Sequence, residues 1–405
     1  MKIAVVHERY IQPGGEDRAF ESETALLESR GHDVVRYEQR NDQIPEMGRL
    51  SLAARAHWNA RANRRLRRLL HEERPDVVHF HNTFPILGPS AYWAAKSEGL
   101  PVVQTLHNYR LLCPNAQLYR DGGPCEDCVG RRFAWPSILH SCYHHGRLAT
   151  GVVASTFALH RGLGTFSRKV DRYVALTEFG RRKFVEGGLP PESVRVKPNF
   201  LDEDPGMGRG GGGYALFVGR LSEEKGVRTL VEAWERLRGR IPLKVVGDGP
   251  ESPRVASAAE RIDGIEWLGR RPREEVLERM REARLLVFPS VWYEGLPFVI
   301  VEAFAAGLPV VASDLGGMSE IIRHGETGWL VPAGDPAALA KAVESAAADP
   351  EALQRVRRAG RAEFDSKYTA TINYERLMAI YAEVVARRTV GKDTGGIPAD
   401  GDATG

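Results

Sequence analysis

The feature that most constrains the fold of this 405-residue chain is an alternation of short apolar runs with amphipathic stretches, present in both halves. KIAVVH, DVVHFH and PVVQTLH are such runs in the first half, and YALFVGR, RLLVFPS and LPVVASD are their counterparts in the second. Runs without polar alternation are typical of strands buried on both faces, and the helical stretches between them supply the covering layers. The pattern predicts an α/β protein with doubly wound parallel sheets.

The two series are separated by GMGRGGGG at 206–213, a stretch that suits neither a helix nor a strand interior. We therefore predict two Rossmann-like domains facing a central cleft, with ligands bound beyond the carboxyl ends of the strands. The expected units are a first domain at 1–200 with an insertion at 107–165, a linker at 201–213, a second domain at 214–364, a helix at 365–388 and a disordered tail at 389–405.

Charge and hydropathy exclude two broad classes of function. The chain has 56 Lys and Arg against 53 Asp and Glu, so its net charge of +3 gives no general affinity for nucleic acid. No apolar run approaches the roughly 20 residues that span a bilayer, and MKIAVVHERY enters a strand without the layout of a signal peptide. We expect a cytoplasmic protein.

One segment is locally basic, and it has the periodicity of an amphipathic helix. It is either a helix covering the sheet with a solvated arginine face, or a docking surface for anionic lipid at the inner face of the membrane. Its apolar positions are Trp58, Ala62, Leu66, Leu69 and Leu70, and its basic positions are Arg61, Arg64, Arg65, Arg67 and Arg68.

Two glutamates, Glu294 and Glu302, stand in the apolar segment VWYEGLPFVIVEAFAAGLPVV, where a carboxylate needs a partner. Pro297 suits the first turn of a helix and Gly307 its end, so Glu302 is expected on the helix and Glu294 in the loop before it. Carboxylates accept from hydroxyls, and a helix N-terminus favours phosphates. The segment predicts a sugar-nucleotide site; ordinary ion pairs with arginines are the alternative.

The loop after YALFVGR, GRLSEEKG, carries Arg220 and Lys225. Two cations at a strand end can neutralise a departing diphosphate without a metal ion. Local pairing with Glu223 and Glu224 is the alternative.

Further strand-end turns are expected at the same cleft. Gly14 and Gly15 open a helix after the first strand, where the backbone can approach a phosphate. Gly247 and Asp248, in GDGPE, form a second turn in which glycine leaves room for a ligand, although Asp248 also suits the turn itself.

The strand PVVQTL ends in His107, followed by Asn108. A histidine facing the cleft can hold a sugar hydroxyl, or it can be a hydrogen-bonded structural residue. His79 and His81 point to one face of the neighbouring strand and are weaker candidates.

Together these residues resemble the retaining glycosyltransferases of family 4, which have the GT-B fold. The resemblance extends from residue 1 to about 388, and EGLPFVIVEAFAAGLPVV is its most specific part. It implies that the final helix crosses back to the first domain. It also implies that Glu302 holds the donor ribose, Glu294 the donor sugar, Arg220 and Lys225 the diphosphate, and His107 the reacting sugar, while the backbone of Gly295, Leu296 and Pro297 contacts sugar and phosphate.

The chain departs from the family at two positions on the acceptor side. The family commonly has aspartate after the strand-end histidine and glutamate two places beyond Gly-Gly, where this chain has Asn108 and Asp17. The nucleotide-binding residues are intact, so the acceptor is the uncertain half of the reaction.

The resemblance implies transfer of a hexose from a UDP-, GDP- or ADP-sugar to a hydroxyl of a saccharide or lipid-linked saccharide, in cell-surface polysaccharide or glycolipid synthesis. No cofactor is required for this chemistry. We favour front-face attack, in which the leaving phosphate helps to remove the acceptor proton, over double displacement by Glu294. The alternatives are an epimerase or phosphorylase of the same fold and a non-catalytic sugar-nucleotide-binding module.

All four cysteines, Cys113, Cys125, Cys128 and Cys142, lie within thirty positions in the insertion. A Cys-x2-Cys pair with two flanking cysteines is compatible with a structural zinc, and a cytoplasmic location argues against disulfides. Reduced structural thiols and redox chemistry are the alternatives. His140, His144 and His145 are nearby substitutes for a cysteine ligand.

Overall fold

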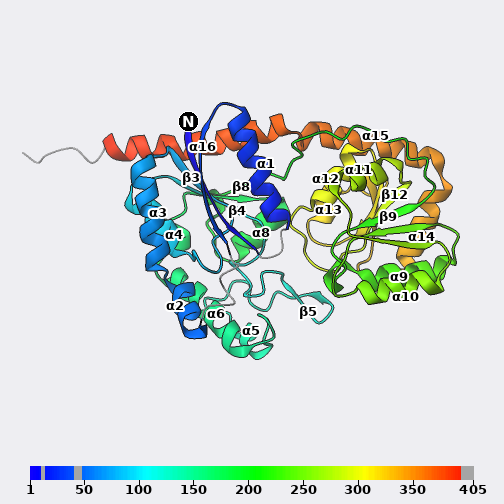
Figure 1. Cartoon of the computed structure of the whole chain (residues 1–405), viewed down its shortest axis with the longest axis horizontal. Helices are drawn as coiled ribbons and strands as arrows, with labels where there is room; N and C mark the ends of the chain where they lie inside the picture. Colours follow the sequence, from blue (N-terminus) through cyan, green and yellow to red (C-terminus); the bar gives the residue numbers. More distant parts are fainter. Residues whose placement is uncertain (11–13, 41–47, 394–405) are drawn as a thin grey trace, which may run out of the picture.

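The chain folds into two α/β lobes that lie side by side, as the computed structural model in Figure 1 shows. The structure describes residues 1–10, 14–40 and 48–393. Each lobe is built on a six-stranded parallel sheet, and the sheets contain twelve of the strands along the chain.

The first lobe has the strand order β2-β1-β3-β4-β7-β8. Its strands are β1 (Lys2–Arg9), β2 (Asp33–Arg40), β3 (Val77–Phe80), β4 (Val102–Leu106), β7 (Arg172–Ala175) and β8 (Val194–Val196). Its helices are α1 (Gly15–Ser29), α2 (Arg49–His57), α3 (Ala60–Glu73), α4 (Ser90–Ser97), α5 (Trp135–Leu139), α6 (Arg147–Gly162), α7 (Thr165–Arg168) and α8 (Glu178–Glu186).

The second lobe has the order β11-β10-β9-β12-β13-β14. Its strands are β9 (Ala215–Val218), β10 (Leu243–Val246), β11 (Ile265–Gly269), β12 (Leu285–Phe288), β13 (Val310–Ser313) and β14 (Gly328–Val331). Its helices are α9 (Val227–Leu237), α10 (Ser252–Arg261), α11 (Arg273–Glu282), α12 (Phe298–Ala305), α13 (Met318–Ile321), α14 (Pro336–Ala348) and α15 (Pro350–Lys367).

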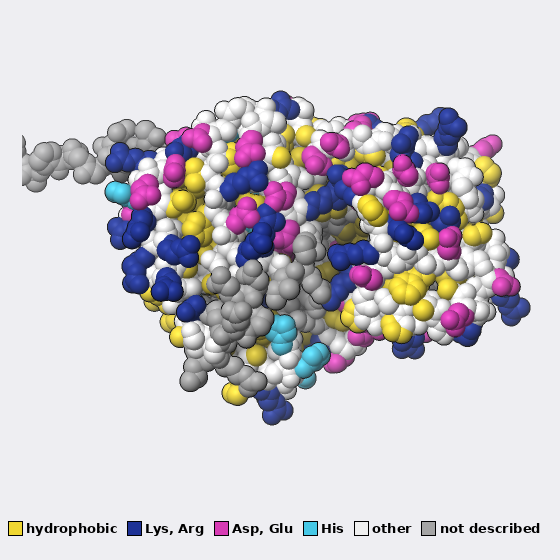
Figure 2. Space-filling view, in the orientation of Figure 1, with side chains coloured by type: hydrophobic (Ala, Val, Ile, Leu, Met, Phe, Trp, Pro, Cys, Tyr) yellow, Lys and Arg dark blue, Asp and Glu magenta, His cyan; other side chains and the backbone are white. Residues whose placement is uncertain are grey.

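The central strands are buried along their whole length, as their apolar runs predict. All four residues of β3, β7, β12 and β13 are buried. Separate apolar clusters pack on the two faces of each sheet, which is what strands without polar alternation require. Because the strands of a sheet are parallel, their carboxyl ends meet at one edge, and the hollow between the lobes in Figure 2 has Lys and Arg side chains at its rim.

The glycine-rich segment between the lobes is held to the second lobe by its backbone. The amides of Gly208, Gly210 and Gly212 donate to the carbonyl oxygens of Ala306, Arg281 and Glu282 at 2.9, 3.0 and 2.9 Å. The expected linker is therefore a fixed strap over α11 and the end of α12.

The final helix differs from the predicted one. The expected single helix at 365–388 is divided: 365–367 belong to α15, and α16 (Ala370–Asp393) begins after a break. The break lies where Leu201 crosses, since the amide of Leu201 donates to the carbonyl of Tyr368 at 3.1 Å. Helix α16 extends through 389–393, which were expected in the tail, and 394–405 lie outside the described residues.

Helix α16 runs across the first lobe, as the orange-red ribbon in Figure 1 shows. Arg172 of β7 and Arg195 of β8 both donate to Glu383, the latter at 2.8 Å. Mainly through the hydrogen bond from Arg172, these arginines lower the pKa of Glu383 to about 2. The contact anchors the end of the chain on the lobe in which the chain begins.

The basic amphipathic segment is helix α3, capped by Asn59, whose side chain accepts from the amide of Ala62 at 3.0 Å. Leu66 and Leu70 are buried against the sheet. Trp58, expected on the apolar face of this helix, precedes the cap instead and stacks on His160 of α6. Within the described ranges, no helix combines the length and apolar character needed to span a bilayer.

Candidate active site

The loop after β12 places Glu294 at the carboxyl edge of the second sheet. The Glu294 side chain is buried, and its Oε1 accepts from Lys225 Nζ at 2.7 Å and from Ser290 Oγ at 2.5 Å. Lys225 therefore pairs with Glu294 rather than with the adjacent Glu223 or Glu224. The structure brings together a carboxylate and a cation that lie 69 positions apart.

Arg220 lies on the same loop as Lys225, directly after β9. Its side chain is exposed and makes no hydrogen bond or ion pair with any described residue. An unpaired guanidinium at a strand-end edge can bind an anion without first breaking a salt bridge.

The loops at this edge pack backbone against backbone, and two glycines allow it. Gly226 has φ +72°, and a Cβ there would lie 1.8 Å from the Pro289 carbonyl oxygen. Gly247 has φ +141°, and a Cβ there would lie 1.9 Å from the carbonyl oxygen of Gly219. The missing side chain of Gly247 thus lets the neighbouring loop pack against it, and a ligand contact with its backbone stays a prediction. Asp248 is exposed, and its carbonyl accepts from the Leu221 amide at 2.8 Å.

Helix α12 follows Pro297 and carries Glu302 on its second turn. Glu302 is buried, and its Oε1 accepts from Arg18 Nη1 of the first lobe at 2.7 Å, with Arg273 Nε at 3.5 Å. The Arg18 guanidinium also lies over the Phe298 ring, 4.1 Å from its centroid. Glu302 is thus ion-paired across the lobes in this structure, as the alternative interpretation of the sequence had it.

The first lobe contributes the start of α1, which begins after Gly14. Asp17 closes a capping box, since its Oδ2 accepts from the Gly14 amide at 2.8 Å while its Oδ1 lies 3.0 Å from His7 Nε2. Gln12 and Pro13 lie outside the described residues. A Cβ on Gly15 would be 3.8 Å from Phe298 Cδ2, so this turn meets the start of α12.

His107, at the end of β4, lies against the donor-side loop. A Cβ on Gly295 would be 3.4 Å from the His107 carbonyl oxygen, and the two residues line one small pocket with Thr177. The carbonyl of Leu296 accepts from Asn199 Nδ2 at 2.8 Å, which ties the same loop to the end of the first lobe. The end of β4 and the loop that carries Glu294 therefore meet from opposite lobes.

Behind His107 lies a buried polar network that the sequence did not indicate. His107 Nε2 is 3.0 Å from His81 Nδ1, and His81 Nε2 is 3.2 Å from Glu23 Oε1. Glu23 Oε2 accepts from Lys197 Nζ at 2.6 Å. The chain of contacts runs from β8 through α1 and β3 to the end of β4, and it joins a charged pair to the candidate catalytic histidine.

Burial and the ion pair of Glu23 with Lys197 set the charges of the side chains in this network. Burial alone would raise the pKa of Glu23, but Lys197 and His79 outweigh it and hold that pKa well below its ordinary value. Burial lowers the pKa of His81 to about 4 and, together with His81, lowers the pKa of His107 well below its ordinary value. At neutral pH both histidines are uncharged. His81 Nε2 lies near the carboxylate without hydrogen-bond geometry, so the tautomer decides which of His81 Nδ1 and His107 Nε2 donates to the other.

Glu23, His79 and His81 form the one group of potential metal ligands in the described residues whose ligand atoms all lie within 4.8 Å. Lys197 already neutralises Glu23. Both nitrogens of His79 have partners, with Tyr381 Oη 2.7 Å from Nδ1 and Thr105 Oγ1 2.8 Å from Nε2. An ammonium group in the place of a cation makes this a hydrogen-bond network and not a metal centre.

Asn108 is tied to a carboxylate at the mouth of the first lobe. Its Nδ2 donates to Glu16 Oε1 at 2.5 Å, and Glu16 Oε2 has no hydrogen-bond partner. Burial raises the pKa of Glu16, and the bond from Asn108 only partly offsets it. Glu16, in the first turn of α1, thus places a carboxyl group beside Asn108.

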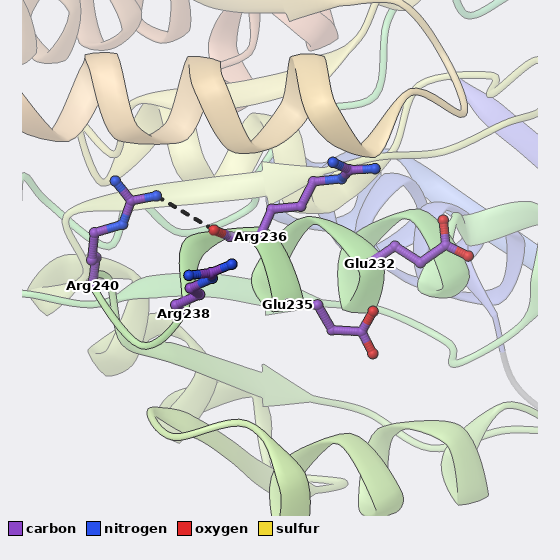
Figure 3. Close-up of a pocket in the computed structure, with 5 residues that line it drawn as sticks. All are labelled: Glu232, Glu235, Arg236, Arg238 and Arg240. Atoms are coloured by element: carbon purple, nitrogen blue, oxygen red, sulfur yellow. Dashed lines mark hydrogen bonds between the residues drawn. The ribbon is translucent and has the colours of Figure 1, made fainter.

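A separate surface depression lies on α9 and the turn after it, lined by Glu232, Glu235, Arg236, Arg238 and Arg240 (Figure 3). This turn leads into the start of β10, so the depression is at the amino ends of the strands. Three of its side chains pair with residues outside it, as in the contact of Glu235 with Arg261 at 2.9 Å. It is remote from the edge where Lys225 and Glu294 lie.

Both halves of the chain match known glycosyltransferase families. Residues 13–205 match the model described as Glycosyltransferase Family 4, and residues 212–349 match Glycosyl transferases group 1. A phosphatidyl-myo-inositol mannosyltransferase of Mycobacterium leprae is 30% identical over 59% of this chain and 69% of that protein. An exopolysaccharide phosphotransferase of Streptomyces coelicolor is 32% identical over 54% of this chain, and the match spans only 24% of that protein.

The fold leads to the same group of proteins. HepE of Anabaena, crystallised with UDP, superposes with a TM-score of 0.68 at 18% identity, over 94% of this chain and all of that one. The predicted pair of doubly wound domains, the GT-B fold, is thereby confirmed. With a family model on each lobe, and with a relative that is 30% identical over 69% of its own length, the chain belongs to the group 1 glycosyltransferases of family 4.

Proposed function

We propose that this chain transfers a hexose, with retained anomeric configuration, from a nucleoside diphosphate sugar to a hydroxyl of a saccharide or lipid-linked saccharide. The observation that carries the proposal is the contact of Lys225 with Glu294 beside the unpaired Arg220, at an edge that faces His107. The UDP in HepE and the mannosyltransferase among the relatives support a sugar nucleotide as donor.

Arg220 and Lys225 are proposed to bind the diphosphate. Negative charge develops on the leaving phosphate as the bond from C1 to the phosphate oxygen breaks, and two cations fixed beforehand stabilise that charge. The start of α12, at Pro297, adds backbone dipoles directed at the same edge. No step in this account needs a metal ion.

Glu302 is proposed to accept from the ribose hydroxyls. In the structure its Oε1 is bound by Arg18 and lies near Arg273. A ribose must therefore replace or rearrange the contact with Arg18, which comes from the other lobe. Donor binding and the relative position of the lobes are then linked through one ion pair.

Glu294 and His107 are proposed to hold the transferred sugar from its two sides. Glu294 is fixed by Lys225 and Ser290, so it acts as a hydrogen-bond acceptor for sugar hydroxyls, and front-face attack is favoured over a covalent adduct. The tautomer in which His107 donates to His81 through Nε2 leaves a lone pair on its Nδ1 to accept from a sugar hydroxyl. The acceptor oxygen bonds to C1, and its proton passes to the departing phosphate.

The acceptor side is proposed to use Glu16, whose Oε2 has no hydrogen-bond partner among the residues that the structure describes. A carboxylate with one bound and one free oxygen can orient an acceptor hydroxyl. It takes the place of the aspartate that the family commonly has where this chain has Asn108.

For a lipid-linked acceptor, we propose peripheral contact with an anionic membrane through α5 and α6. This surface exposes Trp135 (47%), Leu139 (58%) and Leu148 (88%), and Arg131 lies over the Trp135 ring. Exposed apolar side chains with flanking arginines are typical of interfacial binding. Co-sedimentation should increase with acidic lipid and decrease on Leu148→Glu, and equal binding by both proteins would contradict the contact.

Calorimetry with UDP, GDP and ADP, each as free nucleotide and as its glucose and mannose derivative, tests the donor assignment. We expect one nucleotide series to bind and the intact enzyme to release that nucleotide in the presence of an acceptor. The absence of binding by every nucleotide would refute the proposed function. Proton NMR of the glycoside product reports the anomeric configuration, and inversion would refute the retaining mechanism.

A further inference from the structure

We propose that Cys113, Cys125, Cys128 and Cys142 bind one structural zinc ion. The site would close the segment at 107–146, here called the cysteine segment, which leaves β4 and returns at α6. This inference is independent of the proposed donor and acceptor.

The four thiols lie on separate turns of the cysteine segment, and none of them is exposed. Cys113 and Cys128 are buried, and Cys125 and Cys142 are half-buried. Four inward-turned thiols that share one short insertion are a ligand set of the kind that holds a structural zinc ion.

The backbone of the cysteine segment needs an external constraint. Eight described residues other than glycine have positive φ, and six of them are in this segment. They are Ala116, Leu118, Asp121, Ser141, His144 and His145, with φ between 49° and 67°. Apart from the two-residue strands β5 (Tyr119–Arg120) and β6 (Gly123–Pro124) and the five-residue α5, the segment has no regular structure before α6. Unfavourable backbone persists only where other interactions fix it, and four metal bonds would do so.

The structure favours sulfur over the nearby imidazoles. His140, His144 and His145 are exposed, whereas the thiols face inward. Four cysteine ligands form a common tetrahedral zinc site, with sulfur about 2.3 Å from the metal. In the structure, no three of the sulfur atoms lie within 4.8 Å of one another. Their spacing is therefore wider than a zinc site requires. Zinc would draw the turns together.

The site would act on the cleft through Glu126, which lies between Cys125 and Cys128. Glu126 accepts from Lys183 Nζ at 2.7 Å, and the same ammonium lies 6.0 Å from the ring centroid of Tyr293, the residue before Glu294. The hairpin of β5 and β6 extends toward the second lobe in Figure 1. A metal in the cysteine segment would thus fix a contact with the donor-side loop without taking part in the chemistry.

Metal analysis of the full chain, purified without chelator, tests the proposal. We expect about one zinc per chain, retained on gel filtration, and a thiolate-to-cobalt charge-transfer band after replacement by Co²⁺. The Cys128→Ser variant should lose the metal, while the matched variant His140→Ala should retain it. Absence of metal, iron in place of zinc, or a disulfide among the four cysteines would overturn the proposal.

A second measurement uses the unmodified chain, in case the variants fail to fold. Alkylation of native protein, followed by mass spectrometry, should find all four thiols protected and should find them modified together, at least about tenfold faster, once a strong chelator is added. Re-addition of zinc should restore protection. Thiols that react at the same rate with and without chelator would overturn the proposal.

Discussion

The two lobes have similar sheets but place their polar side chains differently. In the first lobe, Glu23, Lys197, His79 and His81 are buried between the sheet and its covering helices. In the second lobe, the sheet core is apolar, and Glu294 and Glu302 are buried only at the edge that faces the cleft.

The difference shows two ways of placing a reactive group. The second lobe fixes its cations and carboxylates with backbone-packed loops, so each contact can be changed with little effect on the core. The first lobe fixes His107 from behind, through neutral histidines and a charged pair that has no access to water. We expect stability and pH response to depend on the first lobe, and turnover and donor affinity to depend on the second.

The largest effect should come from Glu23→Gln. The substitution keeps the size of the side chain but leaves the Lys197 ammonium buried without a counter-charge, which costs about 3–5 kcal/mol of unfolding free energy. Glu302→Gln is the matched change in the second lobe. Its main partner, Arg18, is 25% exposed, so we expect a loss of about 1 kcal/mol or less. Hydrogen exchange of each lobe in urea would measure both.

A double variant separates the charged pair from a general packing defect. Adding Lys197→Met to Glu23→Gln removes the isolated charge and should restore more than half of the lost stability. If the double variant is as unstable as the sum of the single ones, the pair is not the source of the effect. Equal losses in Glu23→Gln and Glu302→Gln would remove the distinction between the lobes.

Lys225→Ala should have the largest effect on turnover. It removes one of two cations at the diphosphate, for which we expect kcat to fall about 10²- to 10³-fold, while the first lobe keeps its exchange protection. Arg220→Ala should also lower kcat by more than it weakens donor binding. Arg228→Ala, in an exposed pair with Glu232 on the next helix, is the control and should leave kcat unchanged. Nucleotide release measures all three, and wild-type turnover in Lys225→Ala would contradict the assignment.

Acid should destabilise the first lobe before the second. The pKa of His81 is about 4 in the folded chain and about 6.5 when unfolded, so the unfolded chain binds the extra proton first as the pH falls. The stability contributed by neutral His81 is complete above pH 6.5 and is lost between about pH 6.5 and pH 4, amounting to about 3 kcal/mol. His107 acts in the same direction, because its pKa is also lowered.

Hydrogen exchange as a function of pH would measure this response lobe by lobe. Amides of β3 and β4 should lose protection between pH 6.5 and pH 4, and those of β12 and β13 should lose less. A His81→Gln variant should show a shallower dependence in the first lobe. Parallel loss of protection in both lobes would mean that the titrating groups are not those of the network.

The sequence predicts the second lobe well because its signals are local. Glu294, Pro297 and Glu302 lie within nine positions, and the turn residues around them place the first in a loop and the last on a helix. The apolar runs predict buried strands such as β3 and β12 for the same reason, since residues buried on both faces of a sheet form consecutive apolar runs in the sequence. Strand and helix positions therefore need no knowledge of the partner lobe.

The first-lobe network and the link between lobes are not local, and the sequence misses them. Glu23 and Lys197 are 174 positions apart, and Arg18 and Glu302 are 284 apart. Glu23, Lys197 and Arg18 also read as ordinary surface residues in the sequence. The break before α16 is missed similarly, because the contact of Leu201 with Tyr368 causes it rather than a glycine or proline.

The smallest effects should come from the ion pair between the lobes. Glu302→Ala should weaken nucleotide binding about 10- to 100-fold, as expected for loss of a hydrogen bond to a charged acceptor. Arg18→Ala removes the protein group that holds the same carboxylate in the structure, so it should leave affinity unchanged or increase it by no more than about fivefold. Calorimetry with the free nucleotide measures both without interference from turnover.

The two variants separate competition from cooperation at Glu302. If Arg18 only occupies the carboxylate until the donor arrives, its removal cannot weaken binding. If Arg18 instead stays in place and contacts the bound nucleotide from the first lobe, Arg18→Ala should weaken binding about as much as Glu302→Ala does. Weaker binding in Arg18→Ala would mean that both lobes share the ribose site. The division between a second lobe that binds the donor and a first lobe that positions it would then apply only to the diphosphate and the transferred sugar.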